Sequence, residues 1–178
     1  QEEPFGIKGD YIYGDYDNYD DQVDNWLKAA HALKARYHLH LSKMNGNQAY
    51  QDALDEVTLA FSDNSEDMQF YYGPQIIESN PLFQFVVIMG EVRMGAYFID
   101  LLKSYDDPRI HVYAMPDGNG EYSGSEPGSG NVQASMPGVA VAAPTAPSYF
   151  ITYAELLFIK AESLFMTGQG ESEVKESL

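Results

Sequence analysis

The chain has 178 residues, 44% of them hydrophobic, which is enough for one domain to bury a core. Its formal net charge of −17 disfavours nucleic acid and anionic membrane surfaces as partners, because both carry negative charge. The absence of Cys excludes disulfides, thiolate metal sites and a cysteine nucleophile. No run of about 18 apolar residues occurs, so the sequence predicts no membrane-spanning helix.

The first 21 residues alternate Gly, Asp and Tyr, a pattern typical of a loop with turns. Tyr13 lies in this segment, where the Tyr rings could stack on a sugar or pack on the following helix. Calcium binding among the nearby carboxylates is a further alternative, although their spacing is not that of an EF-hand loop. The carboxylates in question are those of Asp15, Asp17, Asp20 and Asp21.

Asp24–Met44 is the longest stretch with one clear period, and it predicts an amphipathic helix. Its apolar residues recur every three or four positions, which places them on one face. That face comprises Trp26, Ala30, Leu33, Tyr37, Leu41 and Met44. Three His and four basic residues also lie here, and we interpret them as flanks paired with acidic neighbours. His31 and His38 are two turns apart, too far to share one metal ion.

A second helix is predicted over Gln48–Phe61, after a short link containing Gly46. Gly46 suits a left-handed position at the end of the first helix. The second helix has a small-residue face of Ala49, Ala53, Val57 and Ala60, and small residues allow two helices to approach closely. The two helices therefore predict an antiparallel hairpin resembling one tetratricopeptide unit.

Three consecutive aromatic residues, Phe70, Tyr71 and Tyr72, precede a Gly-Pro pair. They cannot all be buried on one face of a regular element, so we expect at least one to point outward. An outward ring is the best candidate for a platform that stacks on a ligand. The alternative is that the rings fill a gap between helices.

The second half of the chain predicts a more irregular structure. Leu82–Ile88 is an apolar run that could be strand or helix, because periodicity does not decide between them. The remaining predictions are a helix at Glu91–Tyr105, a brief strand at Ile110–Met115, a long loop at Pro116–Pro147 and a helix at Tyr149–Gly168. The residue before a proline avoids the α region, so the helix should end near Asp107-Pro108.

No catalytic pattern is visible in the sequence. There is no G-x-S-x-G, no Gly-rich phosphate loop followed by Lys-Ser or Lys-Thr, and no H-E-x-x-H. Acidic pairs are numerous in so acidic a chain, and none stands out as a glycosidase pair. We therefore expect a protein that is not an enzyme and that needs no cofactor or metal.

Three motifs, in this order, resemble the SusD/RagB family. The first is DYIYG at 10–14 followed by DNWLK at 24–28 and ALKAR at 32–36, the second is DPR at 107–109, and the third is TYAELLFIKAE at 152–162. Together they span about residues 10–168. His31 and Ala32 stand where the family usually has Asn and Ser, a departure from the pattern.

The resemblance implies a mainly α fold of tetratricopeptide-like helical hairpins with long irregular loops. It predicts one partial domain over 1–178, with a helical pair at about 20–61, a loop at about 114–148 and a terminal helix at about 150–167. The Trp26 and Tyr153 segments should then be neighbouring helices. Gln at position 1, and a helix that would start within Gly170–Leu178, also suggest a piece of a longer chain.

The resemblance also implies a function. Family members are non-catalytic lipoproteins on the extracellular face of the outer membrane of Bacteroidota, attached through an N-terminal lipid anchor that this sequence does not contain. They bind an oligosaccharide, or in some cases a peptide, and act as the lid of a SusC-like TonB-dependent transporter. On this interpretation Phe70, Tyr71, Tyr72 and Tyr13 are the candidate ligand-binding residues. A helical-repeat subunit that binds peptide or protein is the alternative.

Overall fold

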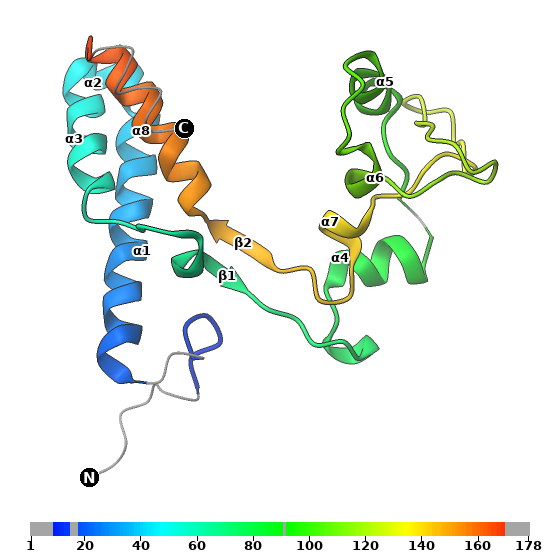
Figure 1. Ribbon diagram of the computed structural model, residues 1–178, viewed down its shortest axis with the longest axis horizontal. Helices are drawn as coiled ribbons and strands as arrows, with labels where there is room; N and C mark the ends of the chain where they lie inside the picture. The colour runs from blue at the N-terminus through cyan, green and yellow to red at the C-terminus, as the bar shows by residue number, and fades with distance from the viewer. Residues whose placement is uncertain (1–8, 15–17, 91, 170–178) are drawn as a thin grey trace. The chain divides into compact units, whose positions relative to one another are not determined.

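The structure is a computed structural model, and it describes residues 9–14, 18–90 and 92–169. The chain forms two compact units: unit 1 is Gln1–Phe70 with Tyr149–Leu178, and unit 2 is Tyr71–Ser148 (Figure 1). The single partial domain over 1–178 stays a prediction. The predictions for Asp15, Asp17 and Gly170–Leu178 concern residues outside the described ranges.

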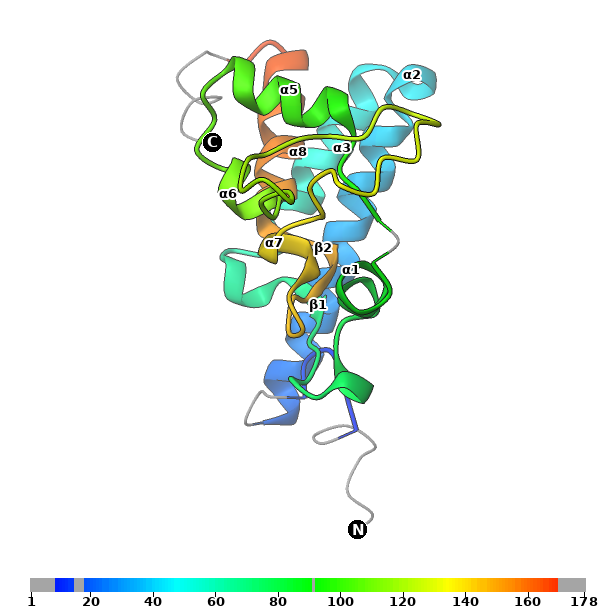
Figure 2. The same ribbon diagram turned by 90° about the vertical axis from the view of Figure 1, so that its right-hand side faces the viewer.

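Unit 1 is helical, with one short two-stranded sheet in which β1 pairs with β2. Its elements are α1 (Tyr19–His40), α2 (Ser42–Asn45), α3 (Asn47–Val57), η1 (Asn64–Glu66), β1 (Met68–Phe70), β2 (Ser148–Ile151) and α8 (Tyr153–Met166). Helices α1, α3 and α8 lie side by side in both ribbon views (Figures 1 and 2). The predicted neighbourhood of the Trp26 and Tyr153 helices is therefore confirmed.

Helix α1 begins five residues before the predicted start. Asn18 is its N-cap, and the Asn18 side chain accepts a hydrogen bond from the backbone N–H of Asp21 at 2.9 Å. Asp20 and Asp21 in the first turn also suit the positive end of the helix dipole. The predicted single helix is interrupted at Leu41, after which α2 adds one short turn.

The buried face of α1 is not the predicted one. Trp26, Tyr37 and Met44 are 41%, 59% and 83% exposed. The helix instead buries a row of small residues, none more than 1% exposed: Ala29, Ala32 and Ala35. The predicted helical period was right, but the predicted buried face is displaced by one position from the observed one, which is about 100° around the helix. Close packing on α3 and α8 selects small side chains, whereas hydrophobicity alone favours the large ones.

The predicted small-residue face of α3 is confirmed. Ala49 and Ala53 have no exposed surface, and Ala60 just after the helix is also buried. Gly46 has a φ of +59°, a conformation that costs a residue with a Cβ atom but not glycine. The predicted hairpin of two closely packed helices thus forms the base of unit 1.

Helix α8 closes unit 1 and shares its core with α1 and α3. Its N-cap Thr152 accepts a hydrogen bond from the N–H of Glu155 at 3.2 Å. The core of buried residues in unit 1 comprises Tyr13, Ala29, Ala32, Ala35, Ala53, Ala60, Phe61, Ile151, Leu156 and Ile159. Three of these, Ile151, Leu156 and Ile159, come from a segment that begins 90 residues after Phe61, so long-range packing holds the unit together.

Unit 2 is built from short helical segments joined by long connections. They are η2 (Ile76–Glu78), α4 (Pro81–Phe83), η3 (Gln84–Ile88), α5 (Ala96–Ser104), α6 (Ile110–Tyr113) and α7 (Val139–Ala142). Its small core comprises Ile99, Leu102, Ile110 and Ala114. The apolar run at Leu82–Ile88 is helical, ending in a π-helical turn.

Two predictions for unit 2 need correction. The helix expected from Glu91 begins only at Ala96. The strand predicted at Ile110–Met115 is wrong, because Ile110–Tyr113 is the helix α6. The side chain of Asp107 accepts a hydrogen bond from the N–H of Arg109 at 2.9 Å, and the turn that this bond closes leads directly into the helix.

The long connection predicted around 114–148 is ordered by backbone hydrogen bonds within itself and to the segment that precedes α5. The N–H of Met94 donates to the carbonyl of Ser135 at 2.8 Å, and that of Met115 donates to Met136 at 2.8 Å. Gly124 lies so close to α5 that a Cβ there would be 2.2 Å from the Cα of Ala96. The Gly and Ser content of this connection therefore permits close backbone contact.

Candidate ligand-binding site

The N-terminal turn of unit 1 is organised by Asp10. Its Oδ1 accepts hydrogen bonds from the N–H groups of Ile12 at 2.8 Å and Tyr13 at 3.1 Å, and its Oδ2 accepts from the indole Nε1 of Trp26 at 2.6 Å. Burial by itself raises the pKa of Asp10, but these three donors together hold it below its usual value. Asp10 therefore stays charged and fixes the turn against α1.

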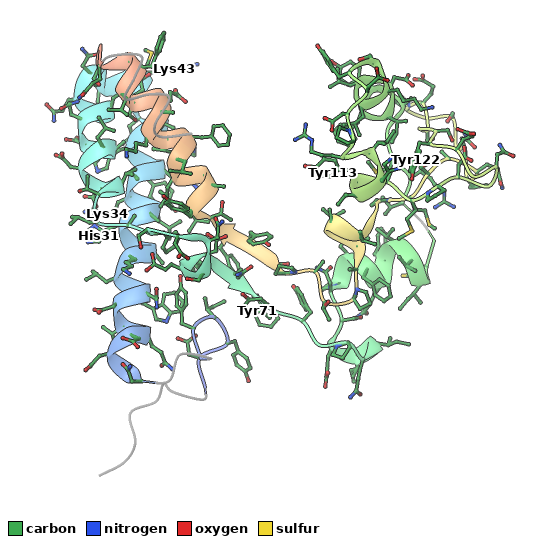
Figure 3. The ribbon with its side chains drawn as sticks, in the orientation of Figure 1. His31, Lys34, Lys43, Tyr71, Tyr113 and Tyr122 are labelled. Atoms are coloured by element: carbon green, nitrogen blue, oxygen red, sulfur yellow. The ribbon has the colours of Figure 1, made fainter. Side chains whose placement is uncertain are left out.

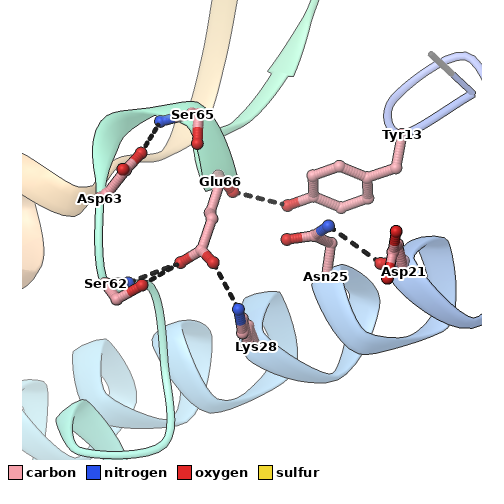
Figure 4. Close-up of polar contacts among 8 residues, drawn as sticks. All are labelled: Tyr13, Asp21, Asn25, Lys28, Ser62, Asp63, Ser65 and Glu66. Carbon is pink, nitrogen blue, oxygen red and sulfur yellow. Dashed lines mark hydrogen bonds and ion pairs between the residues drawn. The ribbon is translucent and has the colours of Figure 1, made fainter. Parts of the chain in front are cut away.

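Tyr13 lies beneath this turn and is only 2% exposed. Its ring meets Trp26 edge to face, with centroids 5.4 Å apart and planes at 90°. Its hydroxyl donates to the backbone carbonyl of Glu66 at 3.1 Å (Figure 4). Tyr13 therefore joins the turn to Trp26 on α1 and to Glu66, and it presents almost no ring area to solvent.

Glu66 in turn holds the segment that leads to the aromatic residues. Its carboxylate pairs with the ammonium of Lys28 and accepts a hydrogen bond from the N–H of Ser62 at 2.6 Å (Figure 4). Burial raises the pKa of Glu66, but the bonds from Lys28 and Ser62 outweigh it and lower the pKa. This places the start of β1 beside the first half of α1.

Phe70, the last residue of β1, is half-buried and lies near Tyr11. The two ring centroids are 6.4 Å apart and the planes are tilted by 40°. Tyr11 is 81% exposed, so this pair presents an aromatic face on unit 1. The sequence analysis selected Tyr13 rather than Tyr11, although both lie in the same Tyr-rich turn.

Tyr71 and Tyr72 belong to unit 2. Tyr71 is 56% exposed, which agrees with the expectation that at least one of the three aromatic rings points outward (Figure 3). Tyr72 is half-buried, and its hydroxyl shares a hydrogen bond with the Oγ of Ser148 at 3.1 Å. The chain passes from unit 1 to unit 2 between Phe70 and Tyr71. The structure therefore brings Tyr13 and Phe70 into one unit, and Tyr71 and Tyr72 into the other.

Asp67 anchors β1 to the last helix. It is 9% exposed, and its Oδ1 accepts a hydrogen bond from the N–H of Tyr153 at 2.6 Å. Burial raises the pKa of Asp67, and this outweighs the lowering by that bond. Tyr153 lies at the start of α8, where backbone N–H groups need partners outside the helix.

These contacts support the exposed ring of Tyr11 and the half-buried ring of Phe70 on unit 1. A flat aromatic ring can stack on the C–H face of a sugar or against an apolar peptide side chain. Within the described ranges, no group of three or more His, Cys, Asp or Glu side chains could hold a metal ion. Ligand binding by Phe70, Tyr71, Tyr72 and Tyr13 stays a prediction, and of the four Tyr71 has the most accessible ring.

Comparison with known families decides the class of protein. A sequence model of a SusD-like family, described as starch-binding and associating with the outer membrane, matches residues 2–175. The chain belongs to the SusD-like family. This confirms the resemblance drawn from the three motifs. A search of curated proteins finds no match.

Solved SusD-like structures share the fold of this chain. A SusD/RagB family protein from Bacteroides thetaiotaomicron matches with a TM-score of 0.75 and 24% identity, over 96% of this chain and 38% of its own. A chitin-binding SusD homologue from Flavobacterium johnsoniae matches with a TM-score of 0.75 and 21% identity, over 98% of this chain and 37% of its own. A SusD homologue from Bacteroides vulgatus matches with a TM-score of 0.70 and 24% identity, over 98% of this chain and 36% of its own. The mainly helical SusD-like fold is confirmed, and the chain spans under two-fifths of these three proteins.

The family also bears on activity and location. The family is described as starch-binding and as associating with the outer membrane. Both statements agree with the expectations drawn from the resemblance. Among the described helices, none is long and apolar enough to cross a membrane.

Proposed function

We propose that this SusD-like chain is part of a non-catalytic glycan-binding protein on the extracellular face of the outer membrane. The observation that carries the proposal is the match of residues 2–175 to a family described as starch-binding. The chitin-binding homologue with the same fold supports a carbohydrate ligand. The ligand is an oligosaccharide bound by a few aromatic anchors.

The charge and surface of the chain are consistent with a neutral ligand. Because the chain has a net charge of −17, it repels anionic polymers, whereas it does not repel a neutral glycan. Exposed rings occur on both units, with Tyr11 81% and Tyr71 56% exposed. We assign direct stacking to Phe70, Tyr71 and Tyr72, and give Tyr13 the supporting position that its burial indicates.

The proposed protein acts with a SusC-like TonB-dependent transporter, over which it forms a lid. Attachment to the membrane is through an N-terminal lipid anchor, as the family resemblance implies. The support for this partnership is the family's association with the outer membrane. Isolation of the complete protein from outer membranes tests it: a large β-barrel transporter should co-purify.

The glycan-binding test compares two tyrosines of similar exposure. Tyr71→Ala in the complete protein should weaken binding to soluble starch or chitin oligosaccharides about tenfold or more, measured by calorimetry. Tyr37→Ala removes a ring that is 59% exposed on α1 and should leave affinity unchanged. Tyr71→Phe keeps the ring and should retain most of the affinity, because stacking needs no hydroxyl.

Two outcomes would contradict the proposal. If Tyr71→Ala and Tyr37→Ala bind equally well, the ligand does not stack on Tyr71. If neither starch nor chitin oligosaccharides bind while a peptide library yields ligands, the protein is the peptide-binding subunit considered as the alternative. Co-purification of the transporter would be expected in either case, so it does not replace the sugar measurement.

A further inference from the structure

Helix α5 of unit 2 ends in an unusual way. The N–H of Asp107 donates to the carbonyl of Leu102 at 2.9 Å, and that of Asp106 donates to Lys103 at 3.1 Å. This pair of bonds defines a Schellman motif, in which the residue after the C-cap adopts a left-handed conformation. That residue is Asp106, with φ of +47°, and it is the one described non-glycine residue with positive φ.

Helix α8 of the same chain ends in the same motif with the usual residue. There the N–H of Gln169 donates to Leu164 at 2.9 Å, and that of Gly168 donates to Phe165 at 3.1 Å. Gly168 has φ of +76°. Glycine adopts this conformation at no steric cost, whereas in Asp the Cβ atom makes the conformation less favourable. The carboxylate of Asp106 is therefore present at a position where stability alone would favour glycine.

Asp106 lies on the rim of a cavity of about 450 Å³, a size typical of small-molecule sites. The cavity is formed by the end of α5, the turn after it and the start of α6. Its lining comprises Leu102, Lys103, Asp106, Asp107, Pro108, Ile110 and His111. Leu102 and Ile110 are 5% and 9% exposed and belong to the core of unit 2, so the cavity has a fixed apolar floor.

Three polar groups of the lining have hydrogen-bonding capacity left. In the described part of the chain, neither the ammonium of Lys103 nor the carboxylate of Asp106 has a hydrogen bond or ion pair, although Lys103 lies near enough to Asp117 to help lower the pKa of that carboxyl. Nδ1 of His111 forms a hydrogen bond with the hydroxyl of Tyr122 at 2.9 Å, and the two rings pack edge to face with their centroids 5.2 Å apart. This contact orients the imidazole and leaves Nε2 for a ligand.

The charges of the lining are balanced. Arg109 binds both carboxylate oxygens of Asp107, with Nε to Oδ1 at 2.9 Å and Nη2 to Oδ2 at 2.6 Å. This lowers the pKa of Asp107 to about 2 and neutralises it. Lys103 and Asp106 remain as one positive and one negative charge. An anionic or a cationic ligand would meet repulsion from one of them, whereas a hydroxyl can accept from the first and donate to the second.

We propose that this cavity binds a single neutral sugar unit. The C–H face of the sugar ring lies against Pro108, the exposed apolar residue of the lining, over the floor of Leu102 and Ile110. Its hydroxyls hydrogen-bond to Lys103, Asp106 and His111. The choice of a sugar rests on the proposed glycan-binding function, but the site uses none of the residues assigned there. It adds a second contact point for a glycan chain.

Saturation-transfer NMR on the complete protein tests this, with methyl α-D-glucopyranoside and N-acetylglucosamine as probes. We expect saturable binding with a dissociation constant on the order of millimolar for so small a ligand. Asp106→Asn and Lys103→Met should each weaken it about tenfold. Asp106→Gly should weaken it equally while keeping the turn, which excludes misfolding as the cause.

Matched controls are Asp100→Asn, an exposed carboxylate earlier on α5, and Lys43→Met, an exposed lysine at the end of α2. Both should bind as the unaltered protein does. Tyr71→Ala should also leave the monosaccharide signal unchanged, even if it abolishes polysaccharide binding, which separates the two proposals. Absence of saturable sugar binding would overturn the inference. So would stronger binding of phosphate, tetramethylammonium or alanine, or loss of the signal in Tyr71→Ala.

Discussion

Arg36 on α1 and Glu155 on α8 are joined by two parallel hydrogen bonds. The guanidinium Nε donates to Oε1 at 2.5 Å and Nη2 donates to Oε2 at 2.6 Å, and Nη2 also donates to the carbonyl of Phe150 at 2.8 Å. The bond to Glu155 raises the pKa of Arg36 further, although burial opposes it. The pair connects residues 119 positions apart and fixes α8 against the first helix.

Arg36→Lys should therefore destabilise unit 1, although it keeps the charge. A lysine cannot form two parallel hydrogen bonds to one carboxylate and also donate to the carbonyl of Phe150. We therefore expect the free energy of unfolding to fall by about 1–2 kcal/mol. Trp26 is the single Trp of the chain and lies in unit 1, so its fluorescence during urea unfolding reports on this unit.

Arg109→Lys is the matched control, because Arg109 makes a similar pair with Asp107 but in unit 2. It should leave the Trp26 transition unchanged. An unchanged midpoint for Arg36→Lys would show that the pair between α1 and α8 contributes nothing to the stability of unit 1.

Arg36 and Glu155 each lie in one of the motifs that indicated the family. Periodicity predicted that both segments are helices, and the family resemblance predicted that these helices are neighbours. The bidentate pair itself could not be predicted, because facing atoms depend on the rotation of each helix about its axis. That rotation is where the sequence analysis was wrong.

The candidate site shows the same limit. That at least one of Phe70, Tyr71 and Tyr72 points outward followed from their adjacency in the sequence, because neighbouring side chains cannot share one buried face. Which Tyr of the N-terminal turn is buried depends instead on Asp10, whose carboxylate binds two backbone N–H groups and Trp26. Such contacts between distant residues leave no periodic trace in the sequence.

Glu56 on α3 receives two basic side chains from α1. His31 Nδ1 lies 2.6 Å from Oε2 of Glu56, and the ammonium of Lys34 pairs with its Oε1. This confirms the interpretation of the basic flank of α1 as paired with acidic neighbours. Burial raises the pKa of Glu56, but the bonds from Lys34 and His31 exceed that effect and hold it below its ordinary value of 4.5.

Stability of unit 1 should consequently fall in acid through Glu56. Between the ordinary value of 4.5 and the lower folded-state pKa, the unfolded chain binds more protons than the folded chain, so acid favours unfolding. The contribution is complete above that ordinary value and disappears as pH falls through the folded-state pKa. Glu56→Gln should make the urea midpoint less dependent on pH as the pH falls from the ordinary value of 4.5 through the folded-state pKa. Asp55→Asn, an exposed neighbour, should not, and an equal change in both variants would refute the role of Glu56.

The rotation of α1 gives the sharpest test of the packing. Ala32 has no exposed surface, whereas Ala30, two positions earlier on the same helix, is exposed. Ala32→Leu forces three extra carbon atoms into the contact with neighbouring helices and should cost about 1–3 kcal/mol or more. Ala30→Leu should change the free energy of unfolding by less than about 0.5 kcal/mol, since leucine is also a good helix former. Urea unfolding followed by Trp26 fluorescence measures both, and the opposite ranking would restore the face inferred from hydrophobic periodicity.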